Sequence, residues 1–334
     1  MFIILEGTDA SGKSTLADAV RTAMKLRQPS TSLMEIHNGK PRDLMRESVL
    51  QDYVFDIENN HYPYFSILAD RWHWGEVTYA AVKRPETNID GYGLLRQAGW
   101  RWVELFLASR GGATFWVNQP LEVVKARMAI RGDDYITADE LERIYDLYHV
   151  AARNVITLAD TLHPEAYSLD AIPELANYVV SRALFEEKQV EFLRVYPEYI
   201  GVANPKAVFV TADIDSTRGT ALPLVPTDGS PGELFFETLE EEAWRRIGVI
   251  NLNDDTVAYL PELLKKLGSP KLIAMGTDVA NSLLSVFHPS QVTHMKVTPR
   301  DVLTLPLVRW GKYRQELDLL INEPDYQGDE SWQM

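Results

Sequence analysis

The chain has 334 residues, a hydrophobic share of 46%, no cysteine and a formal net charge of −15. This length suits two domains, and the absence of cysteine excludes disulfides and thiolate metal sites. Acidic residues outnumber basic ones in both halves of the chain, which argues against a general DNA-coating protein. No stretch resembles a signal peptide or a membrane span, so we expect a soluble cytoplasmic protein.

Strand and helix patterns alternate along the first 185 residues. Apolar runs predict strands at residues 2–5, 33–36, 64–68, 113–117 and 167–169. Helical patterns occupy residues 13–24, 91–109, 121–130, 138–160 and 173–185. This alternation predicts an α/β fold with a doubly wound parallel sheet covered by helices on both faces.

A second series of the same kind follows. It predicts strands at residues 207–211, 248–252 and 271–275, and helices at residues 233–246, 260–267 and 277–284. We therefore expect a first domain over residues 1–185, a linker helix over 186–205 and a second three-layer α/β domain over 206–310. An acidic, polar and poorly ordered tail is expected over residues 311–334.

A glycine-bracketed loop, GTDASGKST, lies between the first predicted strand and the first predicted helix. It fits the phosphate-loop pattern G-x-x-x-x-G-K-[ST]. Its glycines allow backbone N–H groups to point at phosphate oxygens, and the helix start adds a positive dipole end. Lys13 is expected to reach the β- and γ-phosphates of ATP, and the Ser14 hydroxyl to help hold Mg²⁺. The predicted ATP-binding residues are Gly7, Asp9, Ser11, Gly12, Lys13, Ser14 and Thr15.

The stretch LEGTDASGKST resembles thymidylate kinases and their deoxynucleotide-kinase relatives, whose loop is commonly FEGxDGxGKST. The resemblance implies that Asp9 faces the acceptor nucleotide, and Ala10 replaces the commoner glycine. Because ATP is the donor in such kinases, ATP and Mg²⁺ are the implied cofactors. Thymidylate kinases are commonly dimers, so a homodimer is also implied.

Two further motifs follow in the order that the family has. Asp70-Arg71 ends a predicted strand and resembles the family's DR[YFW] motif, with Tyr79 near the place of its later aromatic. The resemblance implies that Asp70 assists the metal and the nucleophile and that Arg71 clamps the acceptor phosphate. Arg127 and Arg131, spaced to share one helical face, resemble the R-x-x-x-R-G lid. The predicted catalytic residues are Lys13, Asp70, Arg71, Arg127 and Arg131, with Ser14 and Asp70 at the metal.

The acceptor is less narrowly defined by the sequence. The Arg-Glu-Pro segment of thymidylate kinases is not visible, and residues 35–41 read EIHNGKP instead. The aromatic residues between 61 and 74 either stack a base or pack in a core. Glu76 either orients a sugar hydroxyl or a metal-bound water, or is an exposed helix charge. The predicted acceptor-binding residues are Asp9, Tyr64, Phe65, Arg71, Trp72 and Glu76.

Several short segments of the second half resemble the uracil-DNA glycosylase superfamily: AVFVTADIDS, VINLND, KLIAMGTDVANSLL and FHPSQ. The resemblance implies that Asn251 reads a pyrimidine edge, that His288 lies against a flipped nucleotide and that Asp213 or Asp215 activates water. The glycine and proline of the family's first motif are missing. An active glycosylase, an inactive binding domain and a generic α/β domain all remain open.

Three functions follow. The first is an ATP-dependent kinase that passes the γ-phosphate to a thymidine-type deoxynucleotide. The second is a kinase for 5-hydroxymethyluracil in DNA, with the second domain binding the base. It resembles the DNA-hypermodification kinases that some phages encode. The third is a nucleotide-gated binding module without kinase activity.

Overall fold

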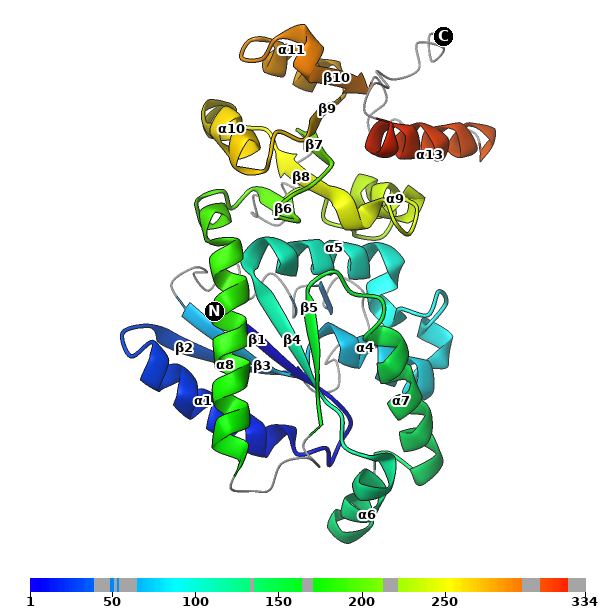
Figure 1. The fold of residues 1–334 in the computed structure, drawn as a ribbon. Coiled ribbons are helices and arrows are strands. Elements are labelled where there is room, and N and C mark those ends of the chain that lie inside the picture. The colour runs from blue at the N-terminus through cyan, green and yellow to red at the C-terminus, as the bar shows by residue number, and fades with distance from the viewer. Residues whose placement is uncertain are drawn as a thin grey trace. The chain divides into compact units, whose positions relative to one another are not determined.

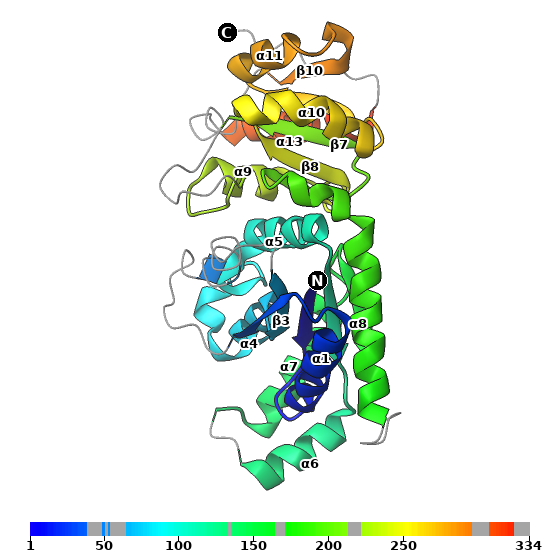
Figure 2. The same cartoon turned by 90° about the vertical axis from the view of Figure 1, so that its left-hand side faces the viewer.

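The computed structural model describes residues 1–38, 49–50, 53, 65–132, 135–163, 171–212, 222–295 and 307–323. Contacts divide the chain into two compact units. One comprises Met1–Arg96 with Arg110–Glu191, and the other comprises Gln97–Ser109 with Phe192–Met334. Each unit contains a five-stranded sheet with helices beside it (Figures 1 and 2), which confirms the predicted α/β class with two sheets. Within the described ranges, no helix is long and apolar enough to cross a membrane.

The sheet of the first unit is entirely parallel and has the strand order β2-β3-β1-β4-β5. Its strands are β1 (Phe2–Glu6), β2 (Ser32–His37), β3 (Phe65–Asp70), β4 (Gly112–Val117) and β5 (Leu158–Leu162). The register aligns Leu5 with Asp70, and Asp70 with His37, so the polar residues that end these strands meet at one edge.

The central strand β1 is buried on both sides, because helices cover both faces of this sheet. Ile3 and Leu5 belong to the cluster that includes apolar residues of α1 (Lys13–Arg27) and α8 (Ile172–Gln189). Phe2 and Glu6 point to the opposite face, where α4 (His73–Lys83) packs against α7 (Ala138–Ala151). Alternation of side chains along β1 therefore separates the two layers.

The predicted helix over residues 138–160 is wrong at its carboxyl end. Helix α7 ends at Ala151, and the chain then turns and forms β5, which pairs in parallel with β4. The consecutive β-branched residues 155–157 explain the difference, because such residues favour strands over helices. The strand predicted at residues 167–169 lies outside the described residues.

The sheet of the second unit has the order β10-β9-β7-β8-β6. Its strands are β6 (Tyr199–Gly201), β7 (Ala207–Thr211), β8 (Ile247–Asn251), β9 (Lys271–Met275) and β10 (Val292–Met295), and only the edge strand β6 is antiparallel to its neighbour. Its helices include α9 (Pro231–Thr238), α10 (Asp254–Lys266), α11 (Thr277–Leu284) and α13 (Leu307–Asn322). Helix α13 occupies the first part of the segment predicted as a tail.

Most of helix α5 (Arg96–Arg110) belongs to the second unit, although the sequence places it within the first series of elements. The buried Arg101 guanidinium donates hydrogen bonds of 2.7 Å to the carbonyl oxygens of Phe236 and Leu239, at the end of α9. The Trp102 indole donates to the Pro223 carbonyl at 2.9 Å. These contacts explain why α5 groups with elements more than a hundred residues further along the chain.

Candidate functional site

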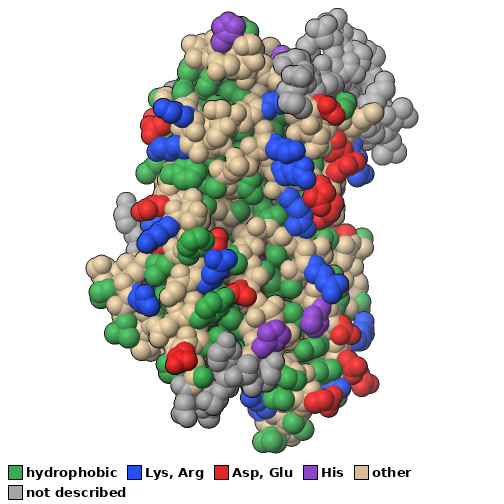
Figure 3. Space-filling model, in the orientation of Figure 1, with side chains coloured by type: hydrophobic (Ala, Val, Ile, Leu, Met, Phe, Trp, Pro, Cys, Tyr) green, Lys and Arg blue, Asp and Glu red, His purple; other side chains and the backbone are tan. Residues whose placement is uncertain are grey.

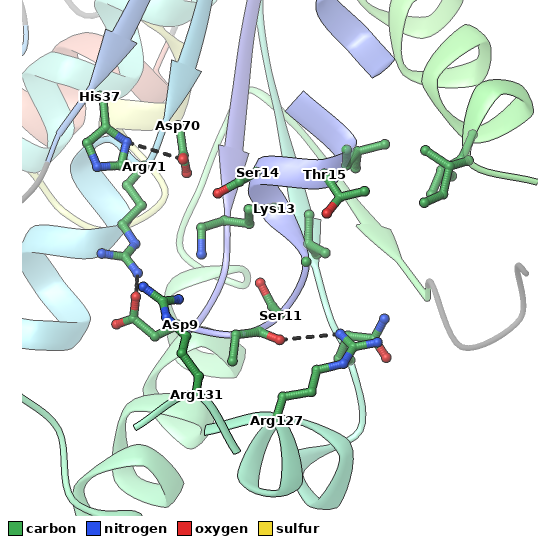
Figure 4. A pocket seen from close by; sticks show the side chains of 17 residues that line it. Asp9, Ser11, Lys13, Ser14, Thr15, His37, Asp70, Arg71, Arg127 and Arg131 are labelled. Carbon is green, nitrogen blue, oxygen red and sulfur yellow. Dashed lines mark hydrogen bonds and ion pairs between the residues drawn. The ribbon is translucent and has the colours of Figure 1, made fainter. Parts of the chain in front are cut away.

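A cavity of about 600 Å³ lies at the carboxyl edge of the first sheet. In open parallel α/β sheets, ligands bind outside the carboxyl ends of the strands, where the strand order reverses. Here the strand order reverses at β1, which lies between β3 and β4. Figure 4 shows the residues around the cavity, which include Asp9, Ser11, Gly12, Lys13, Ser14, Thr15, His37, Asp70, Arg71, Arg127 and Arg131.

The loop after β1 has the backbone that a phosphate-binding loop requires. Gly7 has a φ of +146°, and a Cβ atom there would lie 2.8 Å from the Val117 carbonyl oxygen. Gly12 has a φ of +93° and precedes the first turn of α1. Ala10 also has a positive φ, +59°, where glycine carries no steric cost.

Lys13 folds over this loop. Its Nζ atom donates hydrogen bonds to the carbonyl oxygens of Gly7 at 2.7 Å and Thr8 at 2.6 Å. Burial, and secondly the nearby Arg71 charge, lower the pKa of Lys13 to about 7. An anion in the cavity offsets that desolvation and favours the ammonium form. Lys13 is therefore positioned to bind phosphate.

Asp9, Arg71 and Tyr79 form one polar cluster beside the loop. The Arg71 guanidinium forms an ion pair with the Asp9 carboxylate and lies 5.1 Å from the centre of the Tyr79 ring. Burial alone would raise the pKa of Asp9, but Arg71, Lys13 and Tyr79 together lower it below its usual value. Arg71 itself has a left-handed φ of +64°. Strain at a non-glycine residue of this kind often marks a functional position.

Asp70 and Ser14 line the same cavity, so the structure brings the two predicted metal ligands together. The Asp70 Oδ2 atom lies 3.2 Å from His37 Nδ1. Its Oδ1 atom is buried and has no hydrogen-bond partner among the described residues. Carboxylate and hydroxyl oxygens suit Mg²⁺, which proteins commonly hold with few side chains and the substrate's phosphates. The residues present therefore fit a magnesium ion.

The two lid arginines come from α6 (Leu121–Arg131), and both line the cavity. Arg127 Nη1 donates to the Ala10 carbonyl oxygen at 3.3 Å. Both side chains are exposed at the helix surface, opposite Lys13 across the loop (Figure 4). They add positive charge on the side of the cavity that faces away from β3.

Three residues predicted to bind the acceptor do not line this cavity. Trp72 is completely buried and contacts the Phe2 ring at 5.2 Å, so it belongs to the core. Phe65 begins β3, at the opposite end of that strand from Asp70. Glu76 is also buried: Arg84 Nη2 lies 2.7 Å from its Oε2 atom, and the Leu94 N–H donates to its Oε1 atom at 2.9 Å. Tyr64 lies outside the described residues.

Sequence reasoning missed two residues that shape the site. His37 ends β2 and lines the cavity, and its position directly after a predicted strand was the available signal. Glu6 ends β1, is fully buried, and accepts hydrogen bonds from the backbone N–H groups of Trp72 at 2.7 Å and Trp74 at 3.1 Å. Burial raises the pKa of Glu6, although these donors and His73 act against the shift. The carboxylate fixes the start of α4 directly after Arg71.

The predicted base site of the second domain is not assembled. Asn251 ends β8 and is buried at the carboxyl edge of the sheet, where the register aligns it with Thr211. His288 is exposed and precedes β10, whose first residue Val292 aligns with Leu272 near the start of β9. In a parallel sheet these positions lie at opposite edges. The geometry thus contradicts a site shared by Asn251 and His288, and Asp213 lies outside the described residues.

The chain is similar to two curated proteins. It is 25% identical over 152 residues to the SPbeta prophage-derived uncharacterized protein YorR of Bacillus subtilis strain 168, covering 46% of this chain and 82% of that protein. It is 29% identical over 87 residues to thymidylate kinase of Mesomycoplasma hyopneumoniae strain 7448, covering 25% of this chain and 41% of that enzyme. No family model matches the chain. Together with the phosphate loop, these similarities support a nucleotide-kinase-like region in this chain.

The chain also resembles solved structures. A crystal structure of Bacillus subtilis YorR in complex with phosphorylated GDP is 21% identical, covers 54% of this chain and 96% of that chain, and has a TM-score of 0.42. A structure of deoxyadenosine kinase from M. mycoides with bound dATP is 13% identical, covers 54% of this chain and 99% of that chain, and has a TM-score of 0.34.

Proposed function

We propose that this chain is an ATP-dependent kinase that transfers the γ-phosphate to a thymidine-type deoxynucleotide. The observation that carries the proposal is the convergence of Lys13, Asp70, Arg71 and the two arginines of α6 around one cavity beside the phosphate loop. Phosphoryl transfer needs little covalent chemistry from a protein, and it depends on positioning and on neutralising charge. The cavity's cations suit that requirement, and the similarity to a thymidylate kinase supports the acceptor class.

The proposed reaction forms one bond and breaks one. An oxygen of the acceptor's phosphate attacks the γ-phosphorus of ATP, and the bond from that phosphorus to the β,γ-bridging oxygen breaks. The bonding electrons leave with ADP. Lys13 binds the β- and γ-phosphates, while Arg71 orients the acceptor's phosphate and Asp9 holds that guanidinium in place. Arg127 and Arg131 neutralise charge on the phosphoryl group in flight. Ser14 and Asp70 would hold Mg²⁺, which supplies charge neutralisation at the phosphates when bound.

The decisive experiment is a transfer assay with γ-labelled ATP and Mg²⁺. The acceptors offered are dTMP, dUMP, 5-hydroxymethyl-dUMP and duplex DNA that contains 5-hydroxymethyluracil. Label in a mononucleotide supports the proposal. Label in the DNA alone replaces it with a kinase for modified bases in DNA. ATP hydrolysis without transfer to any acceptor replaces it with a nucleotide-gated binding module.

A matched pair of lysine variants tests the assignment of the loop. Lys13→Ala removes the buried lysine at the start of α1, and Lys25→Ala removes an exposed lysine near the end of the same helix. Transfer should be lost in the first variant and kept in the second. If Lys13→Ala transfers phosphate at the wild-type rate, the phosphate-loop assignment is wrong.

A further inference from the structure

The second unit has a cavity of its own, of about 1000 Å³. It lies at the amino edge of the second sheet, where β7 and β9 begin, beside the ends of α10 and α13. Phe287, Ser290 and Gln291 of the FHPSQ segment also line it. This segment therefore lies at the amino edge of the sheet, whereas Asn251 lies at the carboxyl edge. The lining includes Lys206, Lys265, Lys271, Phe287, Ser290 and Gln291.

The polar lining of this cavity is basic. Three lysines line it, and among the lining residues that the structure describes there is no Asp or Glu. Lys206 and Lys265 are exposed, and neither forms an ion pair with a carboxylate of the described residues. Lys271 donates to the Glu323 carbonyl oxygen at 3.1 Å, and its own backbone N–H donates to the Lys206 carbonyl at 3.0 Å. Lys271 thus lies on β9 and Lys206 directly precedes the neighbouring strand β7, and neighbouring strands are about 4.8 Å apart.

This local excess of positive charge stands out in a chain with a net charge of −15. Figure 3 shows Lys and Arg scattered among Asp and Glu on the face in view, without a broad basic surface. A lysine in the last turn of a helix is ordinarily explained by the helix dipole. That explanation suits both Lys265 and Lys266 in the last turn of α10, and Lys266 also pairs with Glu262 at 2.9 Å. It does not explain Lys271, which lies on β9, or Lys206, which directly precedes β7.

The remaining lining supplies the features that a nucleobase needs. Phe287 is half-buried and Val286 is 44% exposed, so an aromatic ring and an apolar surface lie beside the lysines. Ser290 and Gln291 add exposed polar side chains, whose Oγ and Oε1 atoms also bond to His288, and the Gln291 amide group can in addition donate hydrogen bonds. A basic groove with an aromatic platform is the usual combination for binding single-stranded nucleic acid.

We propose that this cavity binds a short segment of single-stranded nucleic acid, with the lysines on its phosphates and Phe287 stacked on a base. The volume lies at the upper end of the about 300–1000 Å³ that small-molecule pockets occupy, which leaves room for more than one nucleotide. The three lysines come from three different elements, as suits successive phosphates along a strand. The inference is independent of the kinase reaction, because its residues all belong to the second unit.

The test measures fluorescence anisotropy of a labelled, short thymidine oligonucleotide with the full chain at several salt concentrations. The Lys206→Ala/Lys265→Ala variant should bind roughly tenfold more weakly at low salt, and its salt dependence should fall by about one unit of log–log slope per lysine removed. Phe287→Ala should weaken binding and leave that slope unchanged. Lys266→Ala, which removes a lysine outside the cavity on the same helix, should bind as the wild type does.

Three results would overturn the proposal. The first is no binding of the oligonucleotide at low salt. The second is equal loss in Lys266→Ala and in the double lysine variant, which points to diffuse surface charge. The third is complete displacement of the oligonucleotide by dTMP that is added at the same total concentration of phosphate groups, which would make the cavity a mononucleotide site. Lys13→Ala should keep the binding, so failure of the kinase assignment and failure of this site are distinguishable. Thermal unfolding of each variant checks that it is folded.

Discussion

The Tyr79 hydroxyl and Asp9 are joined by two hydrogen bonds in the folded protein, one through the Asp9 carboxylate and one through its backbone N–H, although 70 residues separate them in the chain. The hydroxyl donates to Asp9 Oδ2 at 2.8 Å and accepts from the Asp9 backbone N–H at 3.2 Å. Because Arg71 pairs with the same carboxylate, Tyr79 fixes the phosphate loop relative to the arginine that follows β3. The orientation of Asp9 is thus set by α4 as well as by its own loop.

Replacing this hydroxyl should affect the acceptor more than ATP. Tyr79→Phe removes a hydrogen bond to a carboxylate, and we expect the KM for the acceptor to rise about tenfold. The KM for ATP should change little, because Lys13 and the loop amides remain in place. Tyr178→Phe, which removes an exposed hydroxyl bonded to Asp160, is the matched control. Steady-state kinetics with each substrate varied checks this, and an equal rise in both KM values contradicts the positioning role.

Two substitutions in the phosphate loop should have opposite effects on stability. Ala10→Gly removes the strain of a left-handed alanine and should stabilise the protein by about 0.5–1 kcal/mol, after the larger entropy of the unfolded glycine is deducted. Gly7→Ala places a Cβ atom 2.8 Å from the Val117 carbonyl oxygen and should destabilise the protein. Thermal unfolding of both variants measures the effects. A higher unfolding temperature for Gly7→Ala would be inconsistent with the loop geometry.

Glu76 should act on stability and not on acceptor binding. Glu76→Gln breaks its buried pair with Arg84 and leaves a buried guanidinium without a counter-charge, at a cost of about 3–5 kcal/mol. The folded variant should keep its KM for the acceptor, because Glu76 does not line the cavity. Calorimetry and acceptor kinetics at low temperature measure the two effects. An unchanged unfolding temperature with a raised acceptor KM would return Glu76 to the acceptor site.

The second unit should become more stable as the pH falls from 7 to 5. Burial, and secondly the neighbouring Glu240, raise the pKa of Asp318 to about 6 in the folded protein. The nearby Arg314 charge lowers the pKa of Asp318, but by less than burial and Glu240 raise it. Because the folded state binds this proton more tightly than the unfolded state, protonation through this window stabilises the fold. Asp318→Asn should raise the unfolding temperature at pH 7 and lose that advantage at pH 5. A constant difference between the two proteins would exclude the proton linkage.

The elements that could be predicted from sequence are those with local signals. The phosphate loop, the strand before it and the helix after it are encoded within residues 2–27, so they appear in the structure with small shifts of boundary. Asp70, Arg71, Arg127 and Arg131 were identified by their resemblance to motifs of deoxynucleotide kinases, and all four line one cavity. Asp70 and Arg71 reach it because parallel strands end at one edge of the sheet.

The structure departs most from expectation at residues whose surroundings depend on distant partners. Trp72 and Glu76 have the composition of a binding site, but Phe2 and Arg84 make them part of the core. Asn251 and His288 belong to motifs in a recognised order. However, His288 precedes β10 and so lies at the amino edge of the sheet, whereas Asn251 ends β8 at the carboxyl edge. Nothing in the local sequence distinguishes the two edges until the strand boundaries are known.

From the sequence alone, a phosphate-binding loop is predicted over residues 7–15, since the conformation of that loop follows from its glycines and the helix after it. Only the tertiary structure decided which other side chains reach the loop, because burial and strand order, which are set by packing across the whole unit, select them. The same reason explains the second cavity. No local sequence pattern sets its lysines apart, and they line one cavity only because β7, β9 and α10 come together in the fold.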